Sequence, residues 1–96
     1  MTNKNKDIIY FKKQIEHLKE TCINQSFDNS KNIIDELFKY DWNVGIITEL
    51  KKIYIFLLSS DYNNAIKRIN LMLNRISSII SYILYPKNKT YELITP

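Results

Sequence analysis

Residues 53–73 read IYIFLLSSDYNNAIKRINLML, and this stretch decides the fold. An almost wholly apolar run, IYIFLL, ends at the polar triplet Ser-Ser-Asp, after which apolar residues return at intervals of three and four. Such intervals place side chains on one face of an α-helix. The stretch therefore predicts two helices joined by a turn of three residues, which is too short to let the second helix swing away from the first.

A single alanine, Ala65, follows this turn, and the chain of 96 residues has no other. The first helix of the pair is bulky throughout, so the second must approach it at a position that accepts little more than a methyl group. We expect Ser60 or Asp61 to cap the second helix, Tyr62 to pack over the joint, and Ala65 to permit the close approach. These four residues form a structural helix-hairpin motif.

Three other segments show the same helical spacing. The predicted helices cover about residues 7–23, 30–40, 45–59 and 62–84. Asp28 or Ser30 is available to cap the second of them. The last segment fits either one helix or two with a break at residues 74–78, and Pro86 ends it in both cases. We expect residues 91–94 to add one packed turn.

The apolar stripes of these segments predict one shared core. No stretch alternates apolar and polar residues as a strand would, and no Asn-Gly or Asp-Gly hairpin turn occurs. We therefore predict an all-α fold, a compact bundle of four to five helices with short connections. Residues 7–94 would form this single domain, after a disordered basic tail at residues 1–6. The predicted core residues are Ile8, Phe11, Ile15, Leu18, Cys22, Ile33, Ile34, Leu37, Phe38, Ile46, Ile47, Leu50, Ile53, Tyr54, Leu57, Leu58, Ala65, Ile66, Ile69, Met72, Leu73, Ile76, Ile79, Ile80 and Ile83.

The net charge of +4 is concentrated near the chain ends. Residues 7–85 carry ten basic and nine acidic side chains, so the predicted bundle is almost neutral. Nucleic-acid-binding domains more often carry a basic face on their folded part, and nucleic acid is therefore disfavoured as a partner. The N-terminal residues are too charged for a signal peptide, and the least polar run, residues 76–85, is too short to span a bilayer. We expect a soluble, cytoplasmic chain without membrane insertion.

The sequence contains no recognisable catalytic or metal-binding motif. His17 is the only histidine and Cys22 the only cysteine, and their spacing of five places them on different faces of a helix. A chain with one glycine cannot form a glycine-rich phosphate loop. Asp35 is expected to face Lys39, four residues on. We therefore expect a protein that is not an enzyme and that uses no cofactor or metal.

The polar face of the last helix offers an alternative function. Lys67, Arg68 and Arg75 could contact phosphates, with asparagine side chains beside them. The same residues fit the solvated face of an amphipathic helix, which is the interpretation we favour. A small RNA-associated protein remains the second hypothesis.

Aromatic residues allow two further interpretations. Helix pairs with aromatics and one small residue occur in tetratricopeptide arrays, but the sequence shows no period near ~34 residues and we reject that architecture. Aromatics near helix ends, at Tyr40, Trp42, Tyr82 and Tyr85, are available to partner proteins or to a second copy of the chain. Covering a small core is the simpler use for them.

Residues 49–73, ELKKIYIFLLSSDYNNAIKRINLML, resemble the C-terminal helical domain shared by two eukaryotic families. One is the scaffold subunit of the COPII outer coat, and the other is the steroid receptor RNA activator protein. In that domain an aromatic residue follows a short polar turn and an alanine comes three residues later. Here Tyr62 and Ala65 stand in those positions. Upstream, residues 33–53 resemble the paired helices of the same domain.

Downstream, Tyr82 and Lys87 keep the spacing of a tryptophan and a lysine in that family, although tyrosine replaces the tryptophan and Pro86 interrupts the last helix. The resemblance implies a five-helix bundle with a true break at residues 74–78, no catalytic residues, and a role in protein interaction. For the coat subunit that role is vesicle traffic from the endoplasmic reticulum, and for the other family it is coregulation in the nucleus. The residues offered to a partner or to phosphate are Lys67, Arg68, Arg75, Tyr82 and Lys87.

Overall fold

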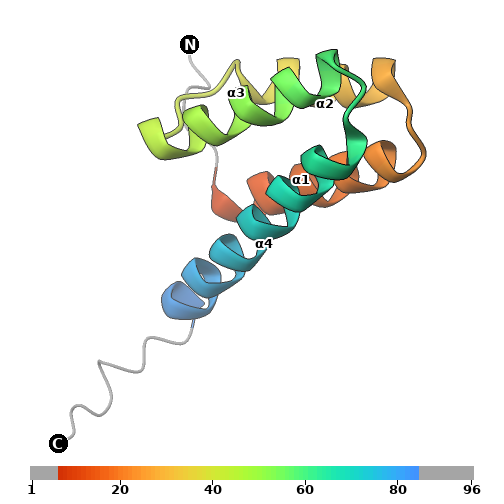
Figure 1. Cartoon of the computed structure of the whole chain (residues 1–96). Helices are drawn as coiled ribbons and strands as arrows, with labels where there is room; N and C mark the ends of the chain where they lie inside the picture. Colours follow the sequence, from red (N-terminus) through yellow and green to blue (C-terminus); the bar gives the residue numbers. More distant parts are fainter. Residues whose placement is uncertain (1–6, 85–96) are drawn as a thin grey trace, which may run out of the picture.

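Four α-helices with short connections make up most of the described chain (Figure 1). The structure is a computed structural model that describes the backbone of residues 7–84 and the side chains of residues 7–78. The helices are α1 (Ile8–Ile23), α2 (Phe27–Leu37), α3 (Val44–Leu58) and α4 (Tyr62–Leu84). No strand occurs within residues 7–84, so the predicted all-α bundle is confirmed. The predicted tail at residues 1–6 and the predicted turn at residues 91–94 lie outside the described residues.

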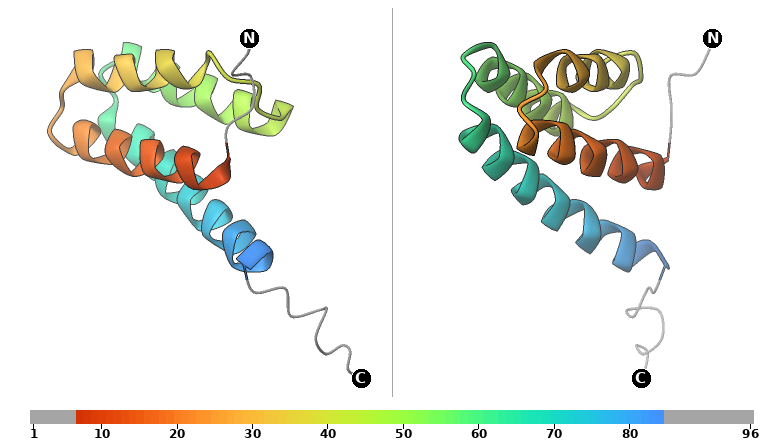
Figure 2. Two further views of the ribbon diagram at one scale, coloured as in Figure 1. Left: turned by 180° about the vertical axis from the view of Figure 1, so that it is seen from behind. Right: turned by 90° about the vertical axis from the view of Figure 1, so that its right-hand side faces the viewer.

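The helices form two antiparallel hairpins, α1–α2 and α3–α4, that close into a ring around one core (Figure 2). Each helix packs against its two neighbours in the ring, and the most extensive contact joins α1 to α4. Thr21 and Ser30 are the buried polar side chains among the described residues. The buried apolar side chains are Phe11, Ile15, Leu18, Cys22, Ile33, Ile34, Leu37, Leu50, Ile53, Leu57, Ala65, Ile69, Met72 and Ile76.

The prediction that Leu58 belongs to the core is wrong, because its side chain is 58% exposed. It follows Leu57 directly and is therefore rotated by about 100° around the helix from that buried residue. The predicted side chains at residues 79, 80 and 83 lie outside the described ones. Other predicted core residues are half-buried, namely Ile8, Phe38, Ile46, Ile47, Tyr54, Ile66 and Leu73.

Side-chain caps fix the start of three helices. In each, an oxygen of the residue before the helix accepts a hydrogen bond from the backbone N–H three residues later. This bond satisfies one of the amides that a helix start leaves unpaired. The pairs are Asp7 with Tyr10 (2.8 Å), Asn43 with Ile46 (2.9 Å), and Asp61 with Asn64 (3.2 Å).

The second helix begins at Phe27, three residues before its predicted start, and ends at Leu37. Its N-cap is Ser26, whose side chain makes no capping hydrogen bond. The prediction that Asp28 or Ser30 caps this helix is therefore wrong. The reason is the packing of Ser30, which is fully buried and bonded to α1, and which therefore lies inside the helix instead of before it.

Both hairpins use the same kind of three-residue joint. Its middle residue has a left-handed backbone, with φ of 55° at Gln25 and 58° at Ser60. The N–H of this residue and the next N–H bond back to carbonyl groups of the last helical turn, which is the Schellman arrangement. The following residue, Ser26 or Asp61, is the N-cap of the next helix. The N–H to C=O bonds are Gln25 to Cys22 (3.0 Å), Ser26 to Thr21 (2.9 Å), Ser60 to Leu57 (3.0 Å) and Asp61 to Phe56 (2.8 Å).

Six buried positions of the two hairpins coincide when one hairpin is shifted by 35 residues. Ser30 and Ala65 are one such pair, each four residues after its N-cap, where the joint demands a small side chain. This match concerns packing and not residue identity, and two hairpins closed into a ring form no extended array. The other matching pairs are Ile15 and Leu50, Leu18 and Ile53, Cys22 and Leu57, Ile34 and Ile69, and Leu37 and Met72.

The fourth helix is unbroken from Tyr62 to Leu84. The break at residues 74–78 that the resemblance implies is not present, and Ile76, in the middle of that segment, is buried. Ile76 is also the last buried side chain that the structure describes, and the helix continues for eight residues beyond it. Figures 1 and 2 show these last turns lying away from the other three helices. The shorter α2, which ends at Leu37, has no such extension.

Candidate interaction surface

A hollow of about 120 Å³ opens between the start of α1, the start of α3 and the middle of α4. Sites for small molecules usually measure ~300–1,000 Å³. The hollow therefore has room for one side chain, but not for a cofactor. Its apolar wall consists of Ile8, Ile46, Met72 and Ile76, and the remaining lining residues are Asn43, Gly45, Glu49 and Arg75.

Gly45 leaves space at the hollow in the first turn of α3. A Cβ at this position would meet only Asn43 Oδ1, at 3.4 Å, which is ordinary van der Waals contact. Neither the backbone conformation nor the neighbouring residues therefore require glycine at this position. The absence of a side chain instead leaves open space in the hollow. The adjacent Val44 is 81% exposed, the highest value for a large apolar side chain among the described residues. An apolar hollow thus lies next to an apolar surface residue.

Glu49 supplies the acidic part of the wall. Its side chain is only 14% exposed, and its carboxylate lies 3.5 Å from Arg68 Nη1 and 3.7 Å from Lys52 Nζ. Because Glu49 belongs to α3 and Arg68 to α4, the ion pair between them joins the two helices of the second hairpin. Arg75, about two turns further along α4, lines the hollow and has no ion-pair partner among residues 7–78.

The predicted basic residues do not form one cluster. Arg68 is paired with Glu49, and Arg75 borders the hollow. Lys67 is exposed and, as the neighbour of Arg68 on a helix, points about 100° away from it. The side chain of Tyr82 and the whole of Lys87 lie outside the described residues. The structure therefore brings Arg68 and Arg75 to one flank of α4 and leaves Lys67 on another.

Trp42 and Tyr40 pack against the start of α1. The Trp42 ring lies 4.7 Å from the ring of Phe11, between centroids, and its indole N–H donates to the carbonyl of Leu37 at 2.7 Å. The Tyr40 and Tyr10 rings lie 5.6 Å apart. Burial, together with the hydrogen bond to Tyr40, raises the pKa of the Tyr10 phenol. These aromatics cover the core beside the α2–α3 connection.

Cys22 is fully buried, and burial raises the pKa of its thiol, while a hydrogen bond to Ser30 partly offsets this rise. A reactive cysteine would need the opposite, an exposed thiol with a lowered pKa. His17 is exposed on α1. Among the described residues, no three His, Cys, Asp or Glu side chains lie together in a way that would hold a metal ion.

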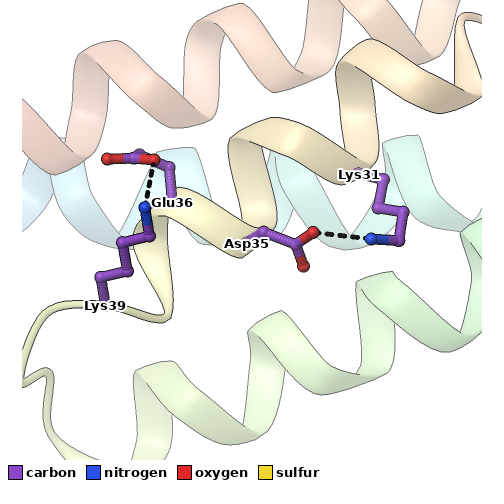
Figure 3. Close-up of polar contacts among 4 residues, drawn as sticks. All are labelled: Lys31, Asp35, Glu36 and Lys39. Carbon is purple, nitrogen blue, oxygen red and sulfur yellow. Dashed lines mark hydrogen bonds and ion pairs between the residues drawn. The ribbon is translucent and has the colours of Figure 1, made fainter.

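The outer face of α2 carries two ion pairs, and they differ from the predicted pairing (Figure 3). Lys31 Nζ lies 2.7 Å from the carboxylate of Asp35, and Lys39 Nζ lies 3.2 Å from that of Glu36. The predicted contact between Asp35 and Lys39 is wrong, because α2 ends at Leu37 and Lys39 lies past its last turn. All four side chains are more than a third exposed, so these pairs add little stability.

The sequence alone does not predict the hollow, because its wall combines residues from three helices. The one local signal is Gly45, the only glycine of the chain, two residues after Asn43. Periodicity identifies Ile46, Met72 and Ile76 as core residues but does not show that a space remains between them.

No protein-family model, no curated protein and no solved structure matches this chain. None of the helices, within the described residues, is long and apolar enough to cross a membrane. A functional proposal therefore rests on the geometry of this surface and on the resemblance of residues 49–73.

Proposed function

We propose that this chain is a non-enzymatic helical interaction domain whose hollow receives an apolar side chain of a partner protein. The observation that carries the proposal is a side-chain-sized space with an apolar wall. The exposed Val44 lies in the chain between two of its lining residues, Asn43 and Gly45. Anchor side chains that fill such spaces supply much of the binding energy of protein interfaces. The rim adds polar groups, Asn43, Glu49 and Arg75, which would fix the orientation of the partner.

A finer proposal concerns the identity of the partner. The resemblance of residues 49–73 to the COPII scaffold domain supports a vesicle-coat component at the endoplasmic reticulum. The unbroken α4 departs from the five-helix arrangement of that domain, and this departure weakens the finer proposal. The alternative, a small RNA-associated or nuclear coregulator-type protein, has less support because Lys67 and Arg68 do not share one face.

Peptide selection with a matched pair of variants tests the role of the hollow. Peptides from a displayed library are selected on the wild-type chain and their affinities are then measured on Gly45→Met and Asn32→Met. The first variant places a flexible apolar side chain at the hollow, and the second places the same side chain on the exposed face of α2. We expect Gly45→Met to weaken binding by about tenfold or more, as the loss of an anchor contact does. Equal affinity for all three proteins would overturn the proposal.

The finer proposal is tested with purified coat and vesicle-fusion components in a pull-down with the wild-type chain. Binding of one component that Gly45→Met abolishes would support it, and failure of every component would refute it. RNA retention that disappears when Lys67, Arg68 and Arg75 are changed to glutamate would instead support the RNA-associated alternative.

A further inference from the structure

We infer that the partner segment that fills the hollow carries a carboxylate beside its apolar anchor side chain, and that this carboxylate pairs with Arg75. The inference rests on the proposed function and adds the chemistry of the partner to it. Two charged residues line the hollow, Glu49 on α3 and Arg75 on α4. The charge that is left for a partner depends on which of them is already paired within the chain.

Glu49 is already neutralised within the second hairpin. Its carboxylate lies 3.5 Å from Arg68 Nη1 and 3.7 Å from Lys52 Nζ, so two cations share one anion. Its side chain is only 14% exposed, which leaves little of it for contact with another molecule. A positively charged partner would have to compete with both of these cations. The acidic residue of the hollow therefore does not select a cationic partner.

Arg75 differs from Glu49 in both respects, because it is exposed and has no ion-pair partner among residues 7–78. Its isolation follows from where α3 begins. The two helices are antiparallel, and Arg68 lies level with Glu49. Seven residues further along α4, at Arg75, the level position would be Trp42, which precedes the start of α3 at Val44. No acidic residue of α3 can therefore meet Arg75 in the way that Glu49 meets Arg68.

The free cation and the apolar wall lie side by side on α4. Met72, Arg75 and Ile76 all line the hollow. Residues three apart on a helix are neighbours on its surface, so Arg75 adjoins Met72. A partner side chain that packs against Met72 and Ile76 therefore brings the adjoining residues of the partner to the guanidinium group. Arginine binds a carboxylate through two parallel N–H donors, which would fix the direction of the partner segment.

A segment with one acidic residue beside one apolar residue matches this surface better than a polyanion does. Nucleic acid is held by several cations that contact successive phosphates. Here Arg68 is occupied by Glu49, and Lys67 points about 100° away from Arg68 around the helix. One free cation beside a space for one side chain instead fits aspartate or glutamate next to leucine, isoleucine or methionine in a partner protein.

Parallel peptide selections on charge variants test the inference. A displayed library with one fixed leucine and randomised neighbouring positions is selected on the wild-type chain, on Arg75→Glu and on Lys67→Glu. The last variant changes the net charge equally at another exposed position of α4. We expect acidic residues near the leucine to be enriched on the wild type and on Lys67→Glu, and basic residues on Arg75→Glu. A wild-type selection without acidic enrichment, or the loss of this enrichment on Lys67→Glu, would overturn the inference.

Titration of the strongest wild-type peptide measures the contribution of the ion pair. Changing its acidic residue to glutamine should weaken binding by about threefold, as for an exposed ion pair. The difference should shrink between about 50 mM and about 500 mM salt, because salt screens exposed charges. On Arg75→Gln the acidic and glutamine peptides should bind equally. A threefold preference for the acidic peptide that persists on Arg75→Gln would show that another group binds the carboxylate, and would refute the inference.

Gly45→Met separates a failure of this inference from a failure of the proposed function. Selected peptides that lack acidic residues but bind Gly45→Met about tenfold more weakly than the wild type would show an anchor without a carboxylate. Only the present inference would then fail. Acidic peptides that bind Gly45→Met as tightly as the wild type would show that the hollow takes no part, and both would fail. Helical circular dichroism of each variant checks that the fold is retained.

Discussion

The hydroxyl groups of Thr21 and Ser30 lie 2.7 Å apart in the buried contact between α1 and α2. Thr21 Oγ1 also lies 2.9 Å from the carbonyl oxygen of Leu18, which can only accept a hydrogen bond. Because Thr21 has one hydroxyl hydrogen and donates it to Leu18, Ser30 is the donor to Thr21. The two buried polar side chains of the described core are therefore both hydrogen-bonded.

Two substitutions of Ser30 are expected to lower the free energy of unfolding by different amounts. Ser30→Ala removes the hydroxyl but keeps the small volume, and Thr21 retains its bond to Leu18, so we expect a loss of about 0.5–1.5 kcal/mol in the free energy of unfolding. Ser30→Leu also overfills the contact between α1 and α2, and the loss should rise by about 1–3 kcal/mol more. Urea denaturation measures both, and a Leu variant as stable as the Ala variant would contradict the close approach.

The matching position in the second hairpin is Ala65, which is fully buried. Ala65→Leu should lower the free energy of unfolding by about 1–3 kcal/mol through overpacking. Lys67→Leu places the same side chain on the exposed face of the same helix and serves as the control. Thermal denaturation compares the two, and an unchanged melting temperature for Ala65→Leu would refute the tight contact.

The left-handed residues of the two joints predict a gain in stability. Gln25 and Ser60 have φ near +55° to +58°, a conformation that costs a residue with a Cβ about 1 kcal/mol and glycine almost nothing. Gln25→Gly and Ser60→Gly should each raise the free energy of unfolding by about 0.5–1 kcal/mol. Ser59, whose φ is −92°, provides the control, because Ser59→Gly gives glycine no such advantage and should destabilise. Chemical denaturation that ranks Ser59→Gly above Ser60→Gly would contradict this prediction.

The buried thiol of Cys22 predicts a dependence of stability on alkaline pH. Burial raises the pKa of this thiol above its ordinary value of 9.0. The folded chain then holds the thiol proton more tightly than the unfolded chain, so this stabilisation is complete below pH 9.0 and is lost as the pH rises through the folded pKa. Tyr10, whose pKa is also raised, contributes in the same direction at higher pH.

Urea denaturation of the wild type and of Cys22→Ala at a series of pH values isolates this effect, because Tyr10 titrates in both proteins. We expect the stability of the wild type to fall more steeply above pH 9.0 than that of the variant. The variant should be less stable than the wild type at neutral pH, because the cavity left by the missing thiol lowers the free energy of unfolding by an amount that does not depend on pH. Parallel pH profiles would show that the Cys22 pKa is not raised.

Much of the fold follows from local patterns in the sequence. The joint at residues 59–61 is visible because an apolar helix stops abruptly at three polar residues, and both the turn and the cap at Asp61 depend on residues close in sequence. The helical spacing of α1 likewise predicts its buried apolar residues, since a single stripe faces a single core, but it does not predict the burial of Thr21. The number of helices also follows once the segment at residues 74–78 is known to be continuous.

The features that the sequence does not predict depend on contacts between helices. The early start of α2 is one of them, because the placement of Ser30 inside the helix is decided by Thr21 on α1. The 35-residue match of the hairpins is another, since different residue types, such as Ser30 and Ala65, satisfy the same packing requirement. The hollow belongs to the same class, because periodicity assigns residues to a core without measuring whether they fill it.

The contact between α1 and α4 has a consequence for the synthesis of this protein. The most extensive contact of α1 is with α4. The apolar face of α1 is therefore fully covered only after residues up to about Ile76 have left the ribosome. Until then, apolar side chains such as Phe11 and Leu18 lack their contacts with α4 and remain partly exposed to solvent. Contacts between distant parts of a chain form late and slowly in comparison with local ones. A ribosome that stalls before α4 is made would therefore expose a segment that chaperones bind and that aggregates.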